Sequence, residues 1–313
     1  ERVSTRKIKA FYGDQRPIDF IESEAIAAEV ALLEPAGSNG IALNSQKTKS
    51  GNAMLLINPH TSFFFRGEMH VVSEEGLNAY GAVTWGQFFI YQGFNEKTGW
   101  MHTSTYTDVI DEFVEEVRKT ANGLEYRYGT QWRPVKSFDT TLKVRSDDGS
   151  LVEQTFTLYR TYHGPVTHQL DDNWVSTAMM WSPARALEQS FIRTKQNGYE
   201  GFSNMMNLKT NSSNNTVYAD AEGNIAYWHG NFIPKRNTRF DYAQPVDGTN
   251  PETDWQGLHE VSEHITLLNP STGWLQNCNS TPFTLAGDDS PKPEYYPYYI
   301  STAPENFRGL HAI

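Results

Sequence analysis

The sequence has a single cysteine, Cys278, among its 313 residues. One thiol cannot form an intrachain disulfide or supply a zinc cluster alone, so cysteine usage leaves the redox compartment open. Long apolar runs are also missing, because the best one, 25–33, is short and interrupted by Glu29. A membrane-spanning helix needs about 20 apolar residues. We therefore expect no transmembrane helix.

Positive charge is in the minority: 26 Lys and Arg oppose 37 Asp and Glu, which gives a formal charge of −11. No segment concentrates the basic residues. Nucleic acid and anionic membranes both require a positive face, so neither is an expected partner. The apolar content of 38% and aromatic content of 13% predict a folded, soluble protein of one large domain or two ordinary ones.

Several catalytic motifs are absent as well. No glycine-rich phosphate loop followed by Lys-Ser or Lys-Thr occurs, and no Gly-x-Ser-x-Gly elbow, which removes the usual support for nucleotide transfer and α/β-hydrolase chemistry. His259 and His264 are five residues apart, whereas a helical zinc pair needs a spacing of four. We therefore reject a zinc site there.

Hydrophobic patterns predict a mixed α and β chain in which strands dominate the first half. An amphipathic helix is expected over 18–33, a helix beginning at Ser182-Pro183, and another over 200–208. Strands are expected over 41–43, 53–57, 151–162, 216–218 and 225–228, the last two forming a hairpin.

The most informative stretch is Gly37-Ser38-Asn39-Gly40, followed by Asn58-Pro59-His60. By periodicity alone it is a loop that leads into two core strands. It resembles, however, the start of the catalytic chain in the penicillin acylase family of N-terminal-nucleophile amidohydrolases. Further matching motifs follow in order: Gly93-Phe94-Asn95, Thr103-Ser104, His163-Gly164-Pro165, Asn215-Thr216-Val217, Asp254-Trp255 and Asn277-Cys278-Asn279-Ser280.

The resemblance implies an α+β fold, a four-layer αββα sandwich of the N-terminal-nucleophile hydrolase type. It also implies autocatalytic cleavage of the Gly37-Ser38 bond. Residues 1–37 would then be the end of an upstream subunit or spacer, and 38–313 a catalytic core truncated at its C-terminal end.

The same resemblance assigns the site. Ser38 would be the nucleophile and, once cut free, its α-amine the base, since the reference pKa of about 7.7 to 8.0 leaves a neutral fraction near pH 7. His60 would orient Ser38; the alternative is a histidine packed at a strand end. The side-chain amide of Asn215 and the backbone N–H of Ser104 would stabilise the oxyanion. Arg236 would fix the amine and the asparagine, or is a surface arginine in a basic neighbourhood.

Asp108 and Asp111 match positions that bind a structural calcium ion in several family members; the alternative is a solvated helix start. No organic cofactor is expected. The partners implied are a small acylated amine as substrate and an upstream α chain from the same precursor, in a periplasmic or secreted location.

The substrate cannot be carried over, because segment 79–88 departs from the family's pattern. The sequence leaves open the acyl group, the amine and the oligomeric state. Two other readings remain: a noncatalytic, aromatic-rich module that binds glycans or cell-surface polymers, and a relative that matures but has lost hydrolysis.

Overall fold

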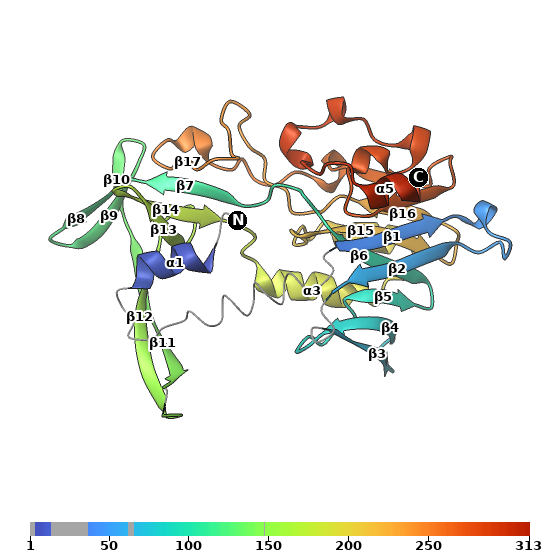
Figure 1. Ribbon diagram of the computed structural model, residues 1–313, viewed down its shortest axis with the longest axis horizontal. Coiled ribbons are helices and arrows are strands. Elements are labelled where there is room, and N and C mark those ends of the chain that lie inside the picture. Colours follow the sequence, from blue (N-terminus) through green and yellow to red (C-terminus); the bar gives the residue numbers. More distant parts are fainter. Residues whose placement is uncertain (1–3, 14–36, 62–65, 147) are drawn as a thin grey trace. The chain divides into compact units, whose positions relative to one another are not determined.

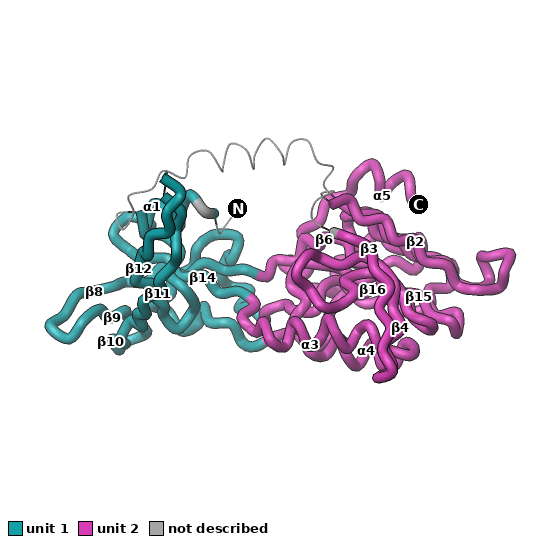
Figure 2. Tube along the Cα trace, turned by 90° about the horizontal axis from the view of Figure 1, so that it is seen from below, with its two compact units in different colours: residues 1–20, 110–179, 235–257 teal, residues 21–109, 180–234, 258–313 magenta. Residues whose placement is uncertain are grey.

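The computed structural model describes residues 4–13, 37–61, 66–146 and 148–313. The chain forms two compact units, coloured separately in Figure 2: unit 1 comprises 1–20, 110–179 and 235–257, and unit 2 comprises 21–109, 180–234 and 258–313. The helix predicted over 18–33 lies outside the described residues. The sequence predicts a boundary between residues 37 and 38 because the chain is expected to be cleaved there. The fold of an uncut chain does not test that boundary.

The described residues of unit 2 form two sheets (Figure 1). The three-stranded sheet has the order β19-β1-β2, built from β19 (Trp274–Asn277), β1 (Gly37–Leu43) and β2 (Met54–His60). The seven-stranded sheet has the order β18-β16-β15-β6-β5-β4-β3. Its strands are β3 (Arg66–Ser73), β4 (Leu77–Thr84), β5 (Gln92–Asn95), β6 (Thr98–Ser104), β15 (Asn214–Asp220), β16 (Ile225–Trp228) and β18 (Thr266–Leu268). The predicted strands 41–43 and 53–57 and the β15–β16 hairpin are confirmed.

The two sheets of unit 2 pack face to face through a buried apolar cluster that includes Ala42, Met101, Val217 and Leu275. The packing of β1 is close because Gly40 has no side chain. A Cβ there would lie 2.9 Å from Val217 Cγ2 and 3.1 Å from Met101 Cγ. Since side chains alternate along a strand, Ser38 shares this inner face of β1 with Gly40 and Ala42.

Two helices, α3 (Pro183–Arg193) and α4 (Tyr199–Met206), cover the other face of the seven-stranded sheet. Phe202 and Met206 of α4 pack there against Trp100, Tyr218 and Trp228, all at most 1% exposed. Burial of such large side chains contributes roughly 1.5–3 kcal/mol each. Both helices were predicted, although Ser182 makes no side-chain hydrogen bond to cap α3.

The described residues of unit 2 thus supply one helical layer and two sheets. On the far side of the three-stranded sheet the predicted second helical layer is not established, since the one further α-helix among the described residues of unit 2, α5 (Phe307–Ala312), is short. The coarser α+β prediction stands. No helix in the described residues is long and apolar enough to cross a membrane.

Unit 1 begins with α1 (Thr5–Tyr12), which packs on a sheet of order β13-β14-β7-β17; a three-stranded sheet β10-β9-β8 and a hairpin β11-β12 complete it. The strands are β7 (Asp111–Glu115), β8 (Val117–Thr120), β9 (Gly123–Tyr128), β10 (Gln131–Pro134), β11 (Lys136–Arg145), β12 (Leu151–Arg160), β13 (Val166–Leu170), β14 (Asn173–Ala178) and β17 (Val246–Asp247). The strand predicted over 151–162 is confirmed as β12.

The core of unit 1 holds a histidine between two acids. Nδ1 of His163 lies 2.9 Å from Glu115 Oε1 and Nε2 lies 3.0 Å from Asp254 Oδ1, while the ring stacks on Phe113 at 4.1 Å. A carboxylate can only accept, so both ring nitrogens donate and the imidazole is charged. Burial lowers the pKa of His163, but the hydrogen bonds and charges of Asp254 and Glu115 together raise it above its ordinary value.

The stability of unit 1 should therefore fall as the medium becomes alkaline. A histidine whose folded-state pKa is raised stabilises the fold fully below about pH 6.5, and this contribution is lost as pH rises through the folded-state pKa. We expect the free energy of unfolding to fall by on the order of 1 kcal/mol as the pH rises from 6 into the alkaline range. Urea unfolding at several pH values measures it. In His163→Gln that dependence should flatten, and an unchanged slope would contradict the assignment.

Candidate functional site

Ser38 is the second residue of β1 and is 6% exposed. Its Oγ donates to the carbonyl oxygen of Gly37 at 2.6 Å, and its backbone N–H donates to Asn279 Oδ1 at 2.5 Å. Gly37 has φ +129°, and a Cβ there would lie 2.7 Å from Asn279 Oδ1. Only glycine fits before this serine, so the Gly37-Ser38 pair that the sequence singled out is a tightly fitted junction.

Asn279 and Arg308 surround the backbone of Ser38. Asn279 has a left-handed backbone with φ +59°, a conformation that asparagine tolerates better than most residues. Nη2 of Arg308 donates to Asn279 Oδ1 at 2.9 Å, and Nη1 donates to the carbonyl oxygen of Ser38 at 2.9 Å. Asn306 caps the N-terminus of α5, and its side-chain amide donates to the Cys278 carbonyl at 3.2 Å, which holds the helix beside Asn279.

Sequence reasoning noted Asn279 within a family motif but gave it no role, and it missed Arg308. The motif was a usable signal for Asn279. No local pattern marks Arg308, because it reaches Ser38 only through the fold of α5.

A second group of polar side chains lies on the seven-stranded sheet. Asn215 is 1% exposed, and its Nδ2 donates to Thr103 Oγ1 at 3.2 Å, to the Ser104 carbonyl at 3.3 Å and to Asn277 Oδ1 at 3.4 Å. Asn279 Nδ2 donates to the same Ser104 carbonyl at 3.3 Å. The backbone N–H of Ser104 was predicted to stabilise the oxyanion. The described contacts instead involve its carbonyl oxygen, which accepts from the side-chain amides of both Asn215 and Asn279.

Packing relates the two groups. Gly40 contacts Val217 and Met101, whereas Leu55, opposite Ala42, approaches Gly99. Ser38 therefore lies toward the other end, where Thr103 pairs with Asn215. Asn279 bonds both the Ser38 N–H and the Ser104 carbonyl. The fold thus brings Ser38, Ser104 and Asn215 to one end of the sandwich, although Ser38 and Asn215 are 177 positions apart in the sequence (215 − 38).

His60 does not contact Ser38 as predicted. It pairs with Gly37 in the sheet, so its ring shares a face with Asn39 and Asn58, and Nε2 lies 3.2 Å from Asn58 Oδ1 and 3.3 Å from Asn39 Nδ2. Ser38 points to the opposite face because neighbouring side chains on a strand alternate. An orienting role of His60 on Ser38 thus has no support in this arrangement and stays a prediction.

Arg236 and Asp111 bond each other within unit 1. Arg236 Nε donates to Asp111 Oδ2 at 2.7 Å and Nη2 donates to Oδ1 at 3.2 Å, while Trp255 Nε1 donates to Oδ2 at 2.5 Å. Arg236 is 5% exposed and Asp111 1%, so Arg236 is not the surface arginine of the alternative reading. In the described contacts the guanidinium beside Ser38 is that of Arg308, and the predicted role of Arg236 stays a prediction.

Both oxygens of the Asp111 carboxylate accept from N–H donors, whereas calcium takes six to eight oxygen ligands, so these contacts give no support to the predicted calcium site. Asp111 opens strand β7 rather than a helix, and Asp108 belongs to unit 2. Among the described residues no group of three or more metal-ligating side chains could hold an ion. Calcium binding remains a prediction without support from these contacts.

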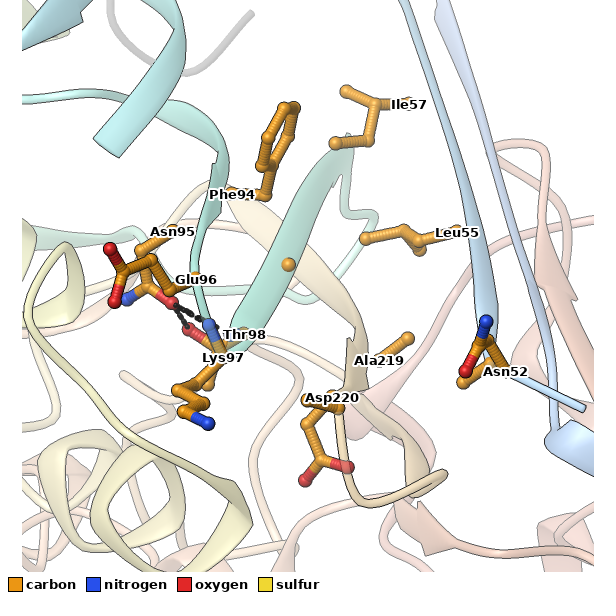
Figure 3. A pocket seen from close by; sticks show the side chains of 13 residues that line it. Asn52, Leu55, Ile57, Phe94, Asn95, Glu96, Lys97, Thr98, Ala219 and Asp220 are labelled. Atoms are coloured by element: carbon orange, nitrogen blue, oxygen red, sulfur yellow. Dashed lines mark hydrogen bonds between the residues drawn. The ribbon is translucent and has the colours of Figure 1, made fainter. Parts of the chain in front are cut away.

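An open groove of about 370 Å³ runs beside β2 (Figure 3). Leu55, Ile57 and Phe94 form its apolar wall, and polar residues of the β5–β6 turn and the end of β15 form the other side. Ile57 pairs with Gly40, two residues along β1 from Ser38. A strand rises about 3.3 Å per residue, so the groove begins roughly 7 Å along the strand from the Ser38 level.

Comparisons with known proteins show which proteins the chain is similar to. Penicillin G acylase of Escherichia coli is 26% identical over 280 residues, which cover 83% of this chain and 31% of the relative. The acyl-homoserine lactone acylase QuiP of Pseudomonas fluorescens is 24% identical over 259 residues, covering 80% and 31%. The solved structure of a thermostable penicillin G acylase from Alcaligenes faecalis aligns with TM-score 0.67 and 23% identity, covering 83% of this chain and 46% of that one.

The chain therefore spans about a third of the length of the curated relatives that it matches. The structural likeness supports the N-terminal-nucleophile hydrolase fold. A family model for penicillin amidase matches residues 3–312, nearly the whole sequence. The chain belongs to the penicillin amidase family.

Proposed function

We propose that the protein is an acylase that hydrolyses a linear amide between an acyl group and an amine, with Ser38 as the nucleophile. Membership of an amidohydrolase family supports the reaction class. The observation that carries the assignment to Ser38 is the contact of its Oγ with the Gly37 carbonyl at 2.6 Å beside Asn279 and Arg308.

Maturation would be the first reaction at this site. The Ser38 hydroxyl attacks the Gly37 carbonyl carbon, the C–N bond breaks as the ester forms, and the Ser38 nitrogen takes up a proton. Water then hydrolyses the ester and leaves a Gly37 carboxylate and a free Ser38 amine. The neighbouring hydroxyl is already held beside the carbonyl, which favours an intramolecular reaction. The product would be a mature enzyme from an inactive precursor.

The freed amine would then act as the base. Asn279 Oδ1 already accepts from the Ser38 nitrogen, so it would hold the amine in place. Arg308 donates to the same oxygen, and its positive charge disfavours a second positive charge on the amine. A neutral amine can take the hydroxyl proton as Ser38 attacks the amide carbon, and return it to the departing amine. Asn279 Nδ2 supplies a donor for the oxyanion.

The apolar groove beside β2 would receive the acyl group. Leu55, Ile57 and Phe94 offer an apolar wall, and Phe94 is 52% exposed. Binding of an acyl chain there would bury apolar surface, which stabilises the complex by about 25 cal/mol for each Å² removed from water. A linear acyl chain of several carbons suits this position better than a short one.

The upstream segment would stay attached after the cut. Tyr12 of α1 is 6% exposed and donates to the Val166 carbonyl at 2.9 Å, and Phe11 packs on Trp174 at 5.2 Å. These contacts hold α1 on unit 1 without the covalent link. An upstream chain from the same precursor is therefore the proposed partner. A periplasmic or secreted location is proposed on the family resemblance.

Ser38→Ala should remain uncut and inactive, because it removes the attacking atom of both reactions. In the wild type, the N-terminal sequence of the mature large chain should begin Ser38-Asn39-Gly40. Intact-mass measurement and hydrolysis of an N-acyl p-nitroaniline check both results. A wild type that stays uncut yet hydrolyses amides would refute the mechanism. A wild type that is cut but inert would be the inactive relative, and one that is uncut and inert would favour the binding module.

Asn279→Ala should lower kcat by roughly a hundredfold or more, since it removes the acceptor for the amine and a preorganised oxyanion donor. Asn58→Ala is the matched control, because Asn58 lies on the opposite face of the strand pair with His60. The same loss in Asn215→Ala would support the donor predicted from sequence. Unchanged turnover in Asn279→Ala would remove that residue from the mechanism.

Phe94→Ala should lower kcat/KM for an octanoyl anilide by roughly five- to tenfold and leave an acetyl anilide unaffected. Phe138→Ala is the control, since Phe138 is also 52% exposed but lies on β11 in unit 1. Steady-state kinetics with both anilides measures the difference. An equal effect on the two substrates would place the acyl group elsewhere.

A further inference from the structure

Arg193 ends α3 and is buried, with 3% of its surface exposed. Its Nη1 donates to His102 Nε2 at 2.7 Å and approaches the Tyr91 carbonyl at 3.4 Å. No ion pair of the described residues includes Arg193, and burial lowers its pKa to about 10. A guanidinium with so little compensation is expensive to bury, so its position calls for a reason.

The bond to Arg193 fixes the tautomer of His102. A guanidinium can only donate, so Nε2 of His102 accepts and Nδ1 carries the proton. Nδ1 lies 3.2 Å from the carbonyl oxygen of Asn215 and 3.2 Å from Thr216 Oγ1. The backbone N–H of His102 donates to Gln92 Oε1 at 3.1 Å, and His102 is 4% exposed. The ring is therefore held at both of its nitrogens.

This contact crosses the seven-stranded sheet. Trp100 and Tyr218 pack toward the helices, so His102 and Thr216, two residues along their strands, face the same side. Met101 and Val217 pack toward β1, so Thr103 and Asn215 face the Ser38 side. The carbonyl of Asn215 therefore receives the His102 bond from behind, while the Asn215 amide points to Thr103, Ser104 and Asn277.

We propose that Arg193 and His102 are positioning residues for the reaction at Ser38: they hold Asn215, and through the shared Ser104 carbonyl Asn279, from the helix side of the sheet. The inference rests on the proposed function. Without Arg193 the ring can carry its proton on Nε2, which turns Nδ1 into an acceptor facing the Asn215 carbonyl. Two acceptors repel, so the Asn215 carbonyl loses its support from the helix side of the sheet.

Arg193→Met tests the kinetic consequence. We expect kcat for an N-acyl p-nitroaniline to fall about tenfold while KM stays within about threefold, because geometry is lost in the transition state rather than in substrate binding. Arg193→Lys keeps a charged donor and should recover part of kcat. Gln189→Met is the control: Gln189 lies on the same helix, is 1% exposed and bonds Thr210 instead of His102.

Rates are divided by the concentration of active sites, taken from the acyl-enzyme burst, so that a partly unfolded variant is not mistaken for a slow one. If Arg193→Met does not fold, His102→Gln replaces it; this variant keeps a polar group toward Arg193 but has none at Nδ1. An unchanged kcat per active site, or an equal loss in Gln189→Met, would overturn the inference.

A second readout does not depend on turnover. In ¹⁵N-labelled protein, the His102 ring should show Nδ1 protonated and Nε2 unprotonated, and Arg193→Met should change this pattern and shift the Asn215 side-chain amide signals. Unaltered Asn215 signals would overturn the inference. If the wild type hydrolyses no amide, the proposed function fails, and these spectra still decide whether Arg193 positions Asn215.

Discussion

The hydrogen bond from the Ser38 nitrogen to Asn279 Oδ1 is the contact on which the rest of the site depends. It requires a left-handed backbone at Asn279 and the absence of a Cβ at Gly37, and both conditions are met. It also joins the three-stranded sheet to the chain that follows β19, and it brings Arg308 to the same oxygen. Three segments of the chain, those of Ser38, Asn279 and Arg308, are thereby fixed around one nitrogen.

Sheet alternation explains what could and what could not be predicted around Ser38. The strands over 41–43 and 53–57 were predictable because each is a short apolar run bounded by polar turns. Both strands extend beyond the predicted runs, so that β1 includes residues 37–40, which periodicity alone predicts as a loop, and β2 reaches His60. The side to which each residue points was not, because it depends on register, and a change of one residue exchanges the faces. Ser38 opposes Pro59 and Gly37 opposes His60, so two residues that seemed neighbours along the strands face opposite ways.

The remaining differences have a similar origin. Family motifs located the segment of Asn279, yet a motif does not say which asparagine reaches Ser38. Asn215 is close in space but has three acceptors of its own, and Arg236 has a buried carboxylate as its partner. Arg308 was out of reach for sequence reasoning, because a single arginine in a short helix carries no periodic signal. Helices and strands follow from local patterns, whereas polar networks follow from tertiary packing.

Strand β1 begins at Gly37 and pairs that residue with His60. A cut after Gly37 would therefore not release the new chain end by itself, since the glycine would still belong to a sheet on one side and lie near the Arg308 guanidinium on the other. A carboxylate held there resembles the acid product of amide hydrolysis. If the proposed cleavage occurs, the Gly37 carboxylate would thus occupy the site and compete with the substrate. Activity would then appear when the chain end at Gly37 leaves the site, and not at the moment of cleavage.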